Sequence, residues 1–208
     1  MTLFSRSKGF IQRLVRGEDV VMVNRDQKTW DHQFKKGAWD RLILQQPNTM
    51  LLAELILDHA MTSKKSLRVL DVGCGNGGLA RLLTVSPMIS YVGTDISEMA
   101  LTTARGEAPQ GHFEEGDAKY PSSSLGTFDI IVFNEVFYYL DPTTVLPRYA
   151  SHTLPTTLIM TSVIRSWRSP FVWGRIKKWI HKKKEFVVRD EHPHTWDLAI
   201  GTFVTSRP

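Results

Sequence analysis

The stretch RVLDVGCGNGGLARLL, from Arg68 to Leu83, decides how the chain folds. An apolar run leads into a turn where Gly73, Gly75 and Gly78 satisfy the pattern G-x-G-x-x-G, and an apolar helical pattern follows. Glycines allow a sharp turn and let a ligand approach the backbone, and the start of a helix offers free N–H groups. The stretch therefore predicts a strand, a turn and a helix that either bind an adenosine-containing ligand or form a tight connection without one.

Strand and helix patterns alternate along the rest of the chain. Such alternation predicts an α/β fold, a doubly wound parallel sheet with helices on both faces. Two later strand-like runs, 184–189 and 196–204, leave no room for a crossover helix between them, so we expect an antiparallel hairpin at one edge of the sheet. The other expected strands are 67–72, 89–93, 112–117, 128–133 and 156–164. One expected helix begins near Pro47, and the others cover 78–83, 98–105 and 143–151.

The composition fits one domain that is neither secreted nor membrane-spanning. The 208 residues, 42% of them apolar, can bury one sizeable core but are too few for two ordinary domains. No apolar run approaches the length of a membrane span, and basic residues interrupt the first twenty positions, which lack the core of a secretory signal. The single cysteine, Cys74, fits a reducing compartment. We expect a cytoplasmic protein whose N-terminus is a helix around Phe10 and Leu14 rather than a transit peptide.

Basic residues are concentrated in 171–184, which carries six of them against a formal net charge of +5 for the whole chain. Apolar residues recur there at helical spacing, which predicts an amphipathic helix with a basic face. That face would either be solvated or contact an anionic membrane surface or an acidic carrier. Contact with a membrane surface would make the protein peripheral to a membrane. Nucleic acid is an unlikely partner, because no helix-turn-helix or zinc pattern accompanies the charge.

Two acidic residues accompany the glycines at the ends of expected strands. Asp71 stands two residues before Gly73, and Asp95 ends the next strand in YVGTDIS. A carboxylate in that position accepts hydrogen bonds from ribose hydroxyls. Both NAD and S-adenosylmethionine contain such a ribose, so these two residues leave the choice of cofactor open.

Four motifs in order resemble those of the class I S-adenosylmethionine-dependent methyltransferases. DVGCGNG resembles the family's first motif, Asp95 its second-strand acid, EGDA its third motif and FDIIVFNEVFYYL its fourth. The resemblance runs from about Thr49 to the C-terminus. It implies S-adenosyl-L-methionine as the cofactor and a Rossmann-like, seven-stranded, mostly parallel sheet with one antiparallel strand.

The end of the fourth motif, NEVFYYL, is most similar to enzymes that methylate small molecules or sugars, such as the nodulation-factor N-methyltransferase group. The Asn/Asp-Pro-Pro-Tyr/Phe signature of enzymes that methylate exocyclic base amines is missing, because Glu135 and Val136 follow Asn134. The resemblance therefore implies a small-molecule or glycan-like acceptor and argues against a nucleobase.

The resemblance also implies a role for each residue on the cofactor side. Asp71 would hold the ammonium group of the methionine half, which the backbone of Gly73 and Gly75 would approach. Asp95 would accept hydrogen bonds from the ribose hydroxyls. The remaining contacts would be Ile96 packed on adenine, Asp117 and Ala118 at the adenine edge, and Asn134 beneath the cofactor. The alternative for the acids is a solvated side chain at a strand end or turn.

Three residues are candidates for acid–base chemistry at the acceptor. Glu135 follows Asn134 at the mouth of the expected site and is the leading candidate base, although a structural glutamate is the alternative. His192 and His194 lie on the connection between the last two strands, where they would either overhang the acceptor or be exposed loop residues. We expect no metal site, because H-P-H is not a usual ligand spacing and no cysteine pair accompanies it.

Aromatic residues are candidates for binding the acceptor. Of Tyr138 and Tyr139 we expect one to pack in the core and one to line the pocket. Trp30 and Trp39 belong to residues 1–47, which would form a helical lid or substrate-side segment before a methyltransferase domain at 48–208. A helix packed on the edge of the sheet is the alternative for this segment.

The sequence thus predicts an enzyme that transfers a methyl group from S-adenosylmethionine to an oxygen or nitrogen of a small acceptor. One alternative is a nucleotide-dependent oxidoreductase, which would normally need a second substrate-binding region. The other is a non-catalytic partner subunit that binds the cofactor.

Overall fold

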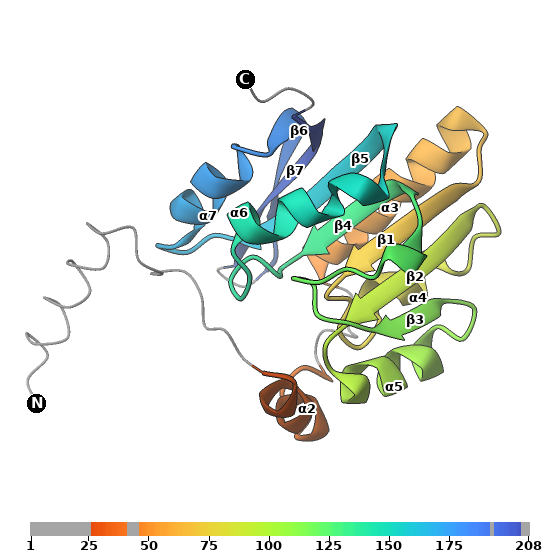
Figure 1. Cartoon of the computed structure of the whole chain (residues 1–208), viewed down its shortest axis with the longest axis vertical. Coiled ribbons are helices and arrows are strands. Elements are labelled where there is room, and N and C mark those ends of the chain that lie inside the picture. Colours follow the sequence, from red (N-terminus) through yellow and green to blue (C-terminus); the bar gives the residue numbers. More distant parts are fainter. Residues whose placement is uncertain (1–25, 41–45, 192–193, 205–208) are drawn as a thin grey trace, which may run out of the picture.

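The apolar runs around the glycine turn form the centre of a seven-stranded sheet (Figure 1). The computed structural model describes residues 26–40, 46–191 and 194–204. The strand order is β3-β2-β1-β4-β5-β7-β6; β1 to β5 run parallel, and β7 runs antiparallel to both β5 and β6. The expected parallel sheet and edge hairpin are confirmed. The strands are β1 (Leu67–Val72), β2 (Ile89–Asp95), β3 (His112–Glu115), β4 (Phe128–Asn134), β5 (Thr153–Ile164), β6 (Ile180–Arg189) and β7 (Thr195–Phe203).

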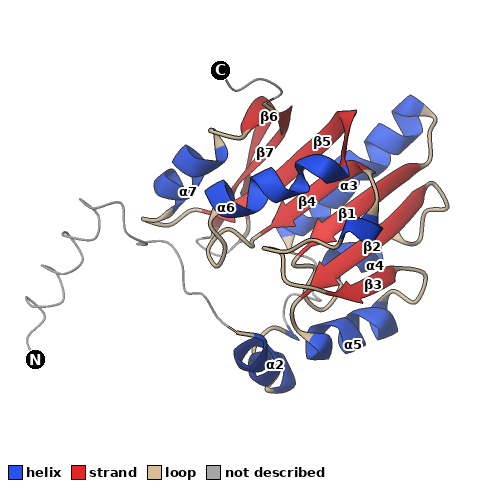
Figure 2. Cartoon of the chain, in the orientation of Figure 1, coloured by secondary structure: helices blue, strands red, loops and turns tan. Residues whose placement is uncertain are grey.

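Helices cover both faces of the sheet, as the alternating pattern predicts (Figure 2). On one face, apolar side chains such as Leu52, Ile56 and Leu101 pack against the strands, and on the other Val145 and Val172 do so. The first layer contains α3 (Pro47–Ser63), α4 (Gly78–Leu83) and α5 (Glu98–Glu107), and the second contains α6 (Pro142–Val145), the 3₁₀ helix η3 (Leu146–His152) and α7 (Ser169–Ile176). The expected helix over 143–151 is therefore a short α-helix that continues as a 3₁₀ helix.

One helix belongs to neither layer. α2 (Gln27–Lys35) begins at Asp26, whose carboxylate accepts a hydrogen bond from the backbone N–H of Thr29. It lies beside α5, beyond the carboxyl ends of the central strands (Figure 1). This placement brings a segment that precedes the sheet in sequence to the edge where open α/β sheets bind ligands.

The prediction of a basic helix over 171–184 is wrong in its second half. α7 ends at Ile176, and β6 begins at Ile180. Lys182, Lys183 and Lys184 therefore lie on the edge strand, where the pairing with β7 shifts register between Lys182 and Lys184. The apolar spacing is compatible with a helix, but pairing along the whole of β7 satisfies the backbone of 180–189 and decides its structure. Lysines and a bulge on an edge strand also oppose pairing with another molecule.

Two expectations concern the chain ends and the membrane. The expected N-terminal helix around Phe10 and Leu14 lies outside the described residues. In the part of the chain that the structure describes, no helix has both the length and the apolar character needed to cross a bilayer.

Candidate active site

A large pocket lies where the carboxyl ends of β1, β2 and β4 face α2. Its volume is about 1450 Å³. The backbone and side chains that line it come from eight separate stretches of the chain, including the connections after β5 and β6. Every candidate residue that the structure describes lines this one pocket: Trp30, Trp39, Asp71, Gly73, Gly75, Asp95, Ile96, Asp117, Ala118, Asn134, Glu135, Tyr138, Tyr139 and His194. His192 lies outside the described residues.

The glycine turn is held tightly against its neighbours. Gly73 has a φ of 71°, and a Cβ atom built there would lie 2.4 Å from a side-chain carbon of Val136. The backbone N–H groups of Gly73 and Cys74 both donate to the carbonyl of Thr94 on β2. Gly75 also has a positive φ, of 54°. Only glycine fits such positions without strain, so the turn presents bare backbone to the pocket.

Asp71 is a buried acid with one oxygen unused. Its side chain is 2% exposed, and its Oδ2 atom accepts a 2.7 Å hydrogen bond from the hydroxyl of Tyr91. Its Oδ1 atom has no hydrogen-bond partner among the described residues. Burial, with a smaller contribution from the charge of Asp95, raises the pKa of Asp71 to about 7. A cationic group placed in the pocket would pair with Oδ1 and favour the charged form.

Asp95 lines the pocket and connects the glycine turn with the loop after β2. One carboxylate oxygen accepts a 2.9 Å hydrogen bond from the N–H of Gly75 and the other a 2.9 Å bond from the N–H of Ser97. Burial raises the pKa of Asp95, and the nearby Asp31 adds to this, whereas the backbone hydrogen bonds oppose it. The orientation of the carboxylate is thus set by the backbone, and each oxygen keeps capacity for a further hydrogen bond from a ligand.

A polar network that the sequence did not predict fixes Asn134. The amide nitrogen of Asn48 donates to Asn134 Oδ1 at 2.9 Å and to Ser162 Oγ at 3.1 Å, and the amide of Asn134 donates to Thr49 Oγ1 at 3.0 Å. From the sequence, Asn48 and Thr49 belong only to the expected start of α3. The signal that could have revealed them is the pair of polar residues opening an otherwise apolar helix, together with the polar Ser162 within an apolar strand.

Glu135 sits in a strained backbone conformation, with a φ of 61°. Its Oε1 atom accepts a 3.2 Å hydrogen bond from the hydroxyl of Ser162. The backbone N–H of Ile164 and the indole N–H of Trp196 also donate to the carboxyl. Burial outweighs these hydrogen bonds and raises the pKa of Glu135 to about 8. The carboxyl is therefore largely uncharged at neutral pH unless a cation lies beside it.

Aromatic rings from α2 and from the segment after β4 meet over the pocket. Trp30 packs edge-on against Tyr139 with ring centroids 4.8 Å apart, and Trp39 lies 5.9 Å from Trp30. The hydroxyl of Tyr138 donates to the carbonyl of Ile164 at 2.9 Å, and its ring packs against the core beneath α6 and α7. Because Tyr138 lines the pocket as well, the expected division into one core tyrosine and one pocket tyrosine does not hold.

Side-chain hydrogen bonds attach the α2 segment to the ends of the strands and the loops after them, and the backbone N–H of Met99 also donates to Asp31, at 3.3 Å. The hydroxyl of Ser97 donates to Asp31 at 2.7 Å, and the amide of Gln27 donates to Glu115 at 2.8 Å. The amide of Asn76, in the glycine turn, donates to the carbonyl of Trp39 at 2.9 Å. The contacts of Ser97 and Asn76 reach the loops that carry Asp95 and Gly75, so the position of α2 is coupled to the cofactor side of the pocket.

His194 lies at the rim of the pocket. Its Nδ1 atom is 3.0 Å from a carboxylate oxygen of Asp190, and its ring lies 5.9 Å from that of Trp196. The residue is exposed. The described residues contain no group of three or more His, Cys, Asp or Glu side chains arranged to hold a metal ion.

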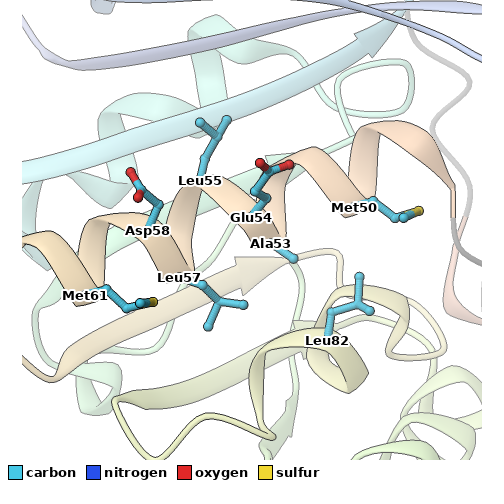
Figure 3. A pocket seen from close by; sticks show the side chains of 8 residues that line it. All are labelled: Met50, Ala53, Glu54, Leu55, Leu57, Asp58, Met61 and Leu82. Carbon is cyan, nitrogen blue, oxygen red and sulfur yellow. The ribbon is translucent and has the colours of Figure 1, made fainter.

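A second hollow, of about 510 Å³, lies on the outer face of α3 and α4 (Figure 3). Met50 and Met61 lie at its two ends, and Leu82 of α4 faces α3 across it. None of the candidate residues lines this hollow. The chemistry that the motifs predict is therefore confined to the large pocket.

Comparisons with known proteins identify a family and several relatives. The family model described as a methyltransferase domain matches residues 44–199. A release factor glutamine methyltransferase of Aliivibrio fischeri is 28% identical over 130 residues, which cover 60% of this chain and 44% of that relative. A malonyl-[acyl-carrier protein] O-methyltransferase of Halalkalibacterium halodurans is 30% identical over 149 residues, which cover 66% of this chain and 55% of that relative. The chain spans about half the length of these curated relatives.

A solved structure shares the fold. The N-methyltransferase NodS of Bradyrhizobium japonicum WM9, in complex with S-adenosyl-L-homocysteine, matches with a TM-score of 0.66 at 15% identity, over 86% of this chain and 98% of that one. The resemblance to the class I methyltransferases, first drawn from four motifs, thus extends to the whole sheet. Since the family model covers most of the sequence, the chain belongs to the methyltransferase domain family, whose members use S-adenosylmethionine.

Proposed function

We propose that the protein transfers the methyl group of S-adenosylmethionine to an oxygen or nitrogen atom of a small acceptor. The observation that carries this proposal is the unpaired Oδ1 atom of Asp71 beside the glycine turn. A buried carboxylate oxygen without a partner is costly, and an ammonium group is the ligand that would relieve that cost best. The amino-acid half of S-adenosylmethionine carries such an ammonium group, whereas NAD does not.

The proposed contacts to the cofactor follow the order of the strands. Asp71 would hold the ammonium group, the backbone at Gly73 and Gly75 would lie against the methionine half, and Asp95 would accept the ribose hydroxyls. The remaining proposed contacts are those of Ile96 with the adenine ring, Asp117 and Ala118 with its edge, and Asn134 with the underside of the cofactor.

We further propose that α2 acts as a lid. Trp30 and Trp39 line the pocket from above the strand ends, and the hydrogen bond from Ser97 to Asp31 holds the helix there. A closed lid excludes water from the reacting groups and keeps the acceptor near the methyl donor. The proposal assigns the N-terminal segment to the acceptor side and the sheet to the cofactor side.

The reaction depends more on holding the methyl donor and the acceptor close together than on chemical activation of either. When bound, S-adenosylmethionine supplies a methyl group that its sulfonium charge already activates. A lone pair of the acceptor attacks the methyl carbon in line, the carbon–sulfur electron pair stays on sulfur, and the acceptor releases its proton. Holding two reactants in this geometry contributes on the order of 7 to 11 kcal/mol in favourable cases.

Glu135 is the proposed proton acceptor. It lines the pocket, and its carboxyl is held in place by donors from β5 and β7. Only its charged form accepts a proton, and a neighbouring cation favours that form. A hydroxyl acceptor would need such a base, whereas an amine needs only to be uncharged. His194 and His192 are the next candidates if Glu135 serves only to hold the acceptor.

The family assignment excludes one of the two alternative functions and leaves the other to be judged from the pocket. The nucleotide-dependent oxidoreductase does not fit a chain that belongs to a methyltransferase family. The non-catalytic partner subunit would keep the cofactor side of the pocket but not the acceptor side. The aromatic residues Tyr138, Tyr139 and Trp30 beyond the cofactor side therefore support an enzyme.

The relatives act on different acceptors according to their names, so the class of acceptor is a proposal of its own. We propose a small-molecule or glycan-like acceptor, because the pocket is enclosed by α2 and lined by tryptophan and tyrosine. Contact of the basic residues of 171–184 with an anionic surface or an acidic carrier also stays a proposal. The exposed lysines of β6 and of the turn before it would make this contact.

Calorimetry on the purified protein tests the proposed function. S-adenosylmethionine and S-adenosylhomocysteine should bind with micromolar affinity, and NAD should not. Transfer is then followed by incubating methyl-labelled cofactor with a panel of acceptors and detecting the labelled product by mass spectrometry. Binding of NAD together with no response to S-adenosylhomocysteine would contradict the assignment.

A further inference from the structure

The pocket has a second end, formed by the connections after β5 and β6. Ser166, Trp167, Arg168, Asp190 and His194 line this end, which is built from chain segments that carry none of the proposed cofactor contacts. We call it the acceptor end. Its chemistry indicates what kind of acceptor the enzyme takes, so the inference below rests on the proposed function.

Charge is distributed unequally between the two ends. The cofactor side carries the acids Asp71, Asp95 and Asp117. At the acceptor end, Asp190 is in contact with His194 at 3.0 Å. The carboxyl of Glu135, between the two ends, is largely uncharged at neutral pH because burial raises its pKa to about 8. In the described part of the chain, the acceptor end therefore carries one carboxylate, Asp190, which is hydrogen-bonded to His194 rather than paired with an arginine of the pocket.

Arg168 is the one arginine among the described residues that line the pocket. Its neighbours in sequence are paired with acids: Arg165 with Asp197 at 2.7 Å and Arg175 with Asp141 at 2.7 Å. No carboxylate within the described ranges lies within ion-pair distance of Arg168. An arginine that lines the pocket and, unlike Arg165 and Arg175, is not paired with a carboxylate of the described residues is available to a ligand.

The guanidinium of Arg168 is also held in place. Its central carbon lies 4.9 Å from the ring centroid of Trp167, an arrangement that orients a cation over an aromatic face. The residue is only partly exposed. A planar guanidinium held on one face presents its N–H groups in a fork that matches the two oxygens of a carboxylate or a phosphate.

We propose that Arg168 binds an anionic group of the methyl acceptor, a carboxylate or a phosphate, and that this anchors the acceptor between Trp167 and Glu135. The acceptor would then be a small molecule with a negatively charged group at one end and the nucleophilic oxygen or nitrogen at the other. Specificity follows from the charge, because a neutral analogue leaves the arginine without a partner.

Simple probes test this anchor without knowledge of the true acceptor. Benzoate and phenyl phosphate are titrated by calorimetry into the full chain, with and without saturating S-adenosylhomocysteine, and each is compared with its neutral counterpart, benzamide or phenol. We expect at least one anion to bind roughly tenfold more tightly than its counterpart, as for hydrogen bonds to a charged group. The anion that binds better identifies the carboxylate or the phosphate as the preferred group.

The variants separate the anchor from a general effect of charge. Arg168→Gln should abolish the preference for the anion, and Arg168→Lys should retain part of it because the charge remains but the fork is lost. Arg165→Gln is the matched control, since it removes an exposed arginine of the same segment and should keep the preference. Equal binding of charged and neutral probes, or a preference that survives in Arg168→Gln, would overturn the inference.

The same experiment distinguishes this inference from the proposed function. S-adenosylhomocysteine is titrated first, alone, into the parent protein and into each variant, and Arg168→Gln should leave its affinity unchanged. A parent protein that does not bind it contradicts the proposed function, whatever the probes do. A parent protein that binds it but does not distinguish anions from neutral probes contradicts only the role of Arg168.

Discussion

The hydroxyl of Tyr91 donates a 2.7 Å hydrogen bond to one carboxyl oxygen of Asp71, and the second oxygen has no partner among the described residues. The bond reaches from β2 to β1 inside the core, and it leaves Oδ1 as the oxygen available to a ligand in the pocket. A hydrogen bond to the charged form of an acid lowers its pKa, so Tyr91 opposes the effect of burial on Asp71. Tyr91 therefore holds the proposed cofactor acid in place and also favours its charged form.

Replacing the tyrosine tests this pairing. Because the charged form of Asp71 binds the ammonium group, affinity for S-adenosylhomocysteine should rise with pH through the pKa of about 7 and level off above it. In Tyr91→Phe the loss of about 1.5 to 3 kcal/mol of hydrogen bonding should move this midpoint up by about one to two pH units. Calorimetry between pH 5.5 and 9 measures it. Tyr149→Phe, a buried tyrosine on the other face of the sheet, is the control and should keep the parent midpoint.

The same acid should govern part of the pH dependence of stability. Its pKa is raised from 3.8 to about 7 by folding, so the unfolded chain releases this proton at lower pH than the folded protein does. Stability is therefore lost as the pH rises from about 4 through 7, by at most about 4 kcal/mol at roughly 1.4 kcal/mol per pKa unit. Asp71→Asn should remove this loss, so that it is more stable than the parent at pH 8 but not at pH 4, and it should no longer bind S-adenosylhomocysteine.

Urea unfolding at the two pH values measures the difference. A variant that is destabilised equally at both would show that Asp71 contributes by packing alone.

Glu135→Gln separates a base from a structural side chain. With a hydroxyl acceptor, turnover should fall at least about a hundredfold with little change in cofactor affinity, because the shape stays and the proton acceptor is lost. With an amine acceptor the loss should be smaller and partly recovered as the pH rises. Because the pKa of Glu135 is about 8 before any ligand binds, a base would also make the parent more active as the pH rises toward that value.

The melting temperature provides the control for this variant. A lower melting temperature with unchanged activity per folded molecule would make Glu135 structural, and His194 and His192 would then be the residues to replace.

Asp31→Ala tests the attachment of α2. The variant loses the hydrogen bonds that the Ser97 hydroxyl and the Met99 N–H donate from the loop and helix after Asp95, so the lid should open more often. We expect S-adenosylhomocysteine to dissociate several-fold faster, which corresponds to about 1 kcal/mol, the size of a typical net hydrogen-bond contribution. Stopped-flow fluorescence measures the rate. Lys28→Ala, on the exposed side of the same helix, is the control, and an identical rate in both variants would contradict a lid.

Changing Lys182, Lys183 and Lys184 together to Gln tests the role of the basic edge strand. Cofactor affinity should stay the same, because β6 lies at the far edge of the sheet from β1 and β2. Association with anionic vesicles should fall, most clearly at low salt, where exposed charges are least screened. Co-sedimentation measures it. If the parent protein does not bind vesicles and only the variant self-associates, the lysines serve to protect the edge strand.

The sequence by itself determined the order of the strands in the chain, the glycine turn and the positions of the acids at the strand ends. These follow from local rules, because an apolar run, a glycine with positive φ and a capped helix each depend on a few adjacent residues. The strand Leu67–Val72 and the helix Gly78–Leu83 were predicted at their observed boundaries for that reason.

Only the tertiary structure decided which side chains meet. Ser162 and Trp196 reach Glu135 from β5 and β7, and Tyr91 reaches Asp71 from β2, through contacts between residues distant in sequence that no spacing within one segment reveals. The same limit explains the wrong helix at 180–184, where the apolar period suits a helix but the backbone hydrogen bonds of β7 are satisfied only by a strand. Local pattern sets what a segment can form, and pairing with a distant segment selects among those forms.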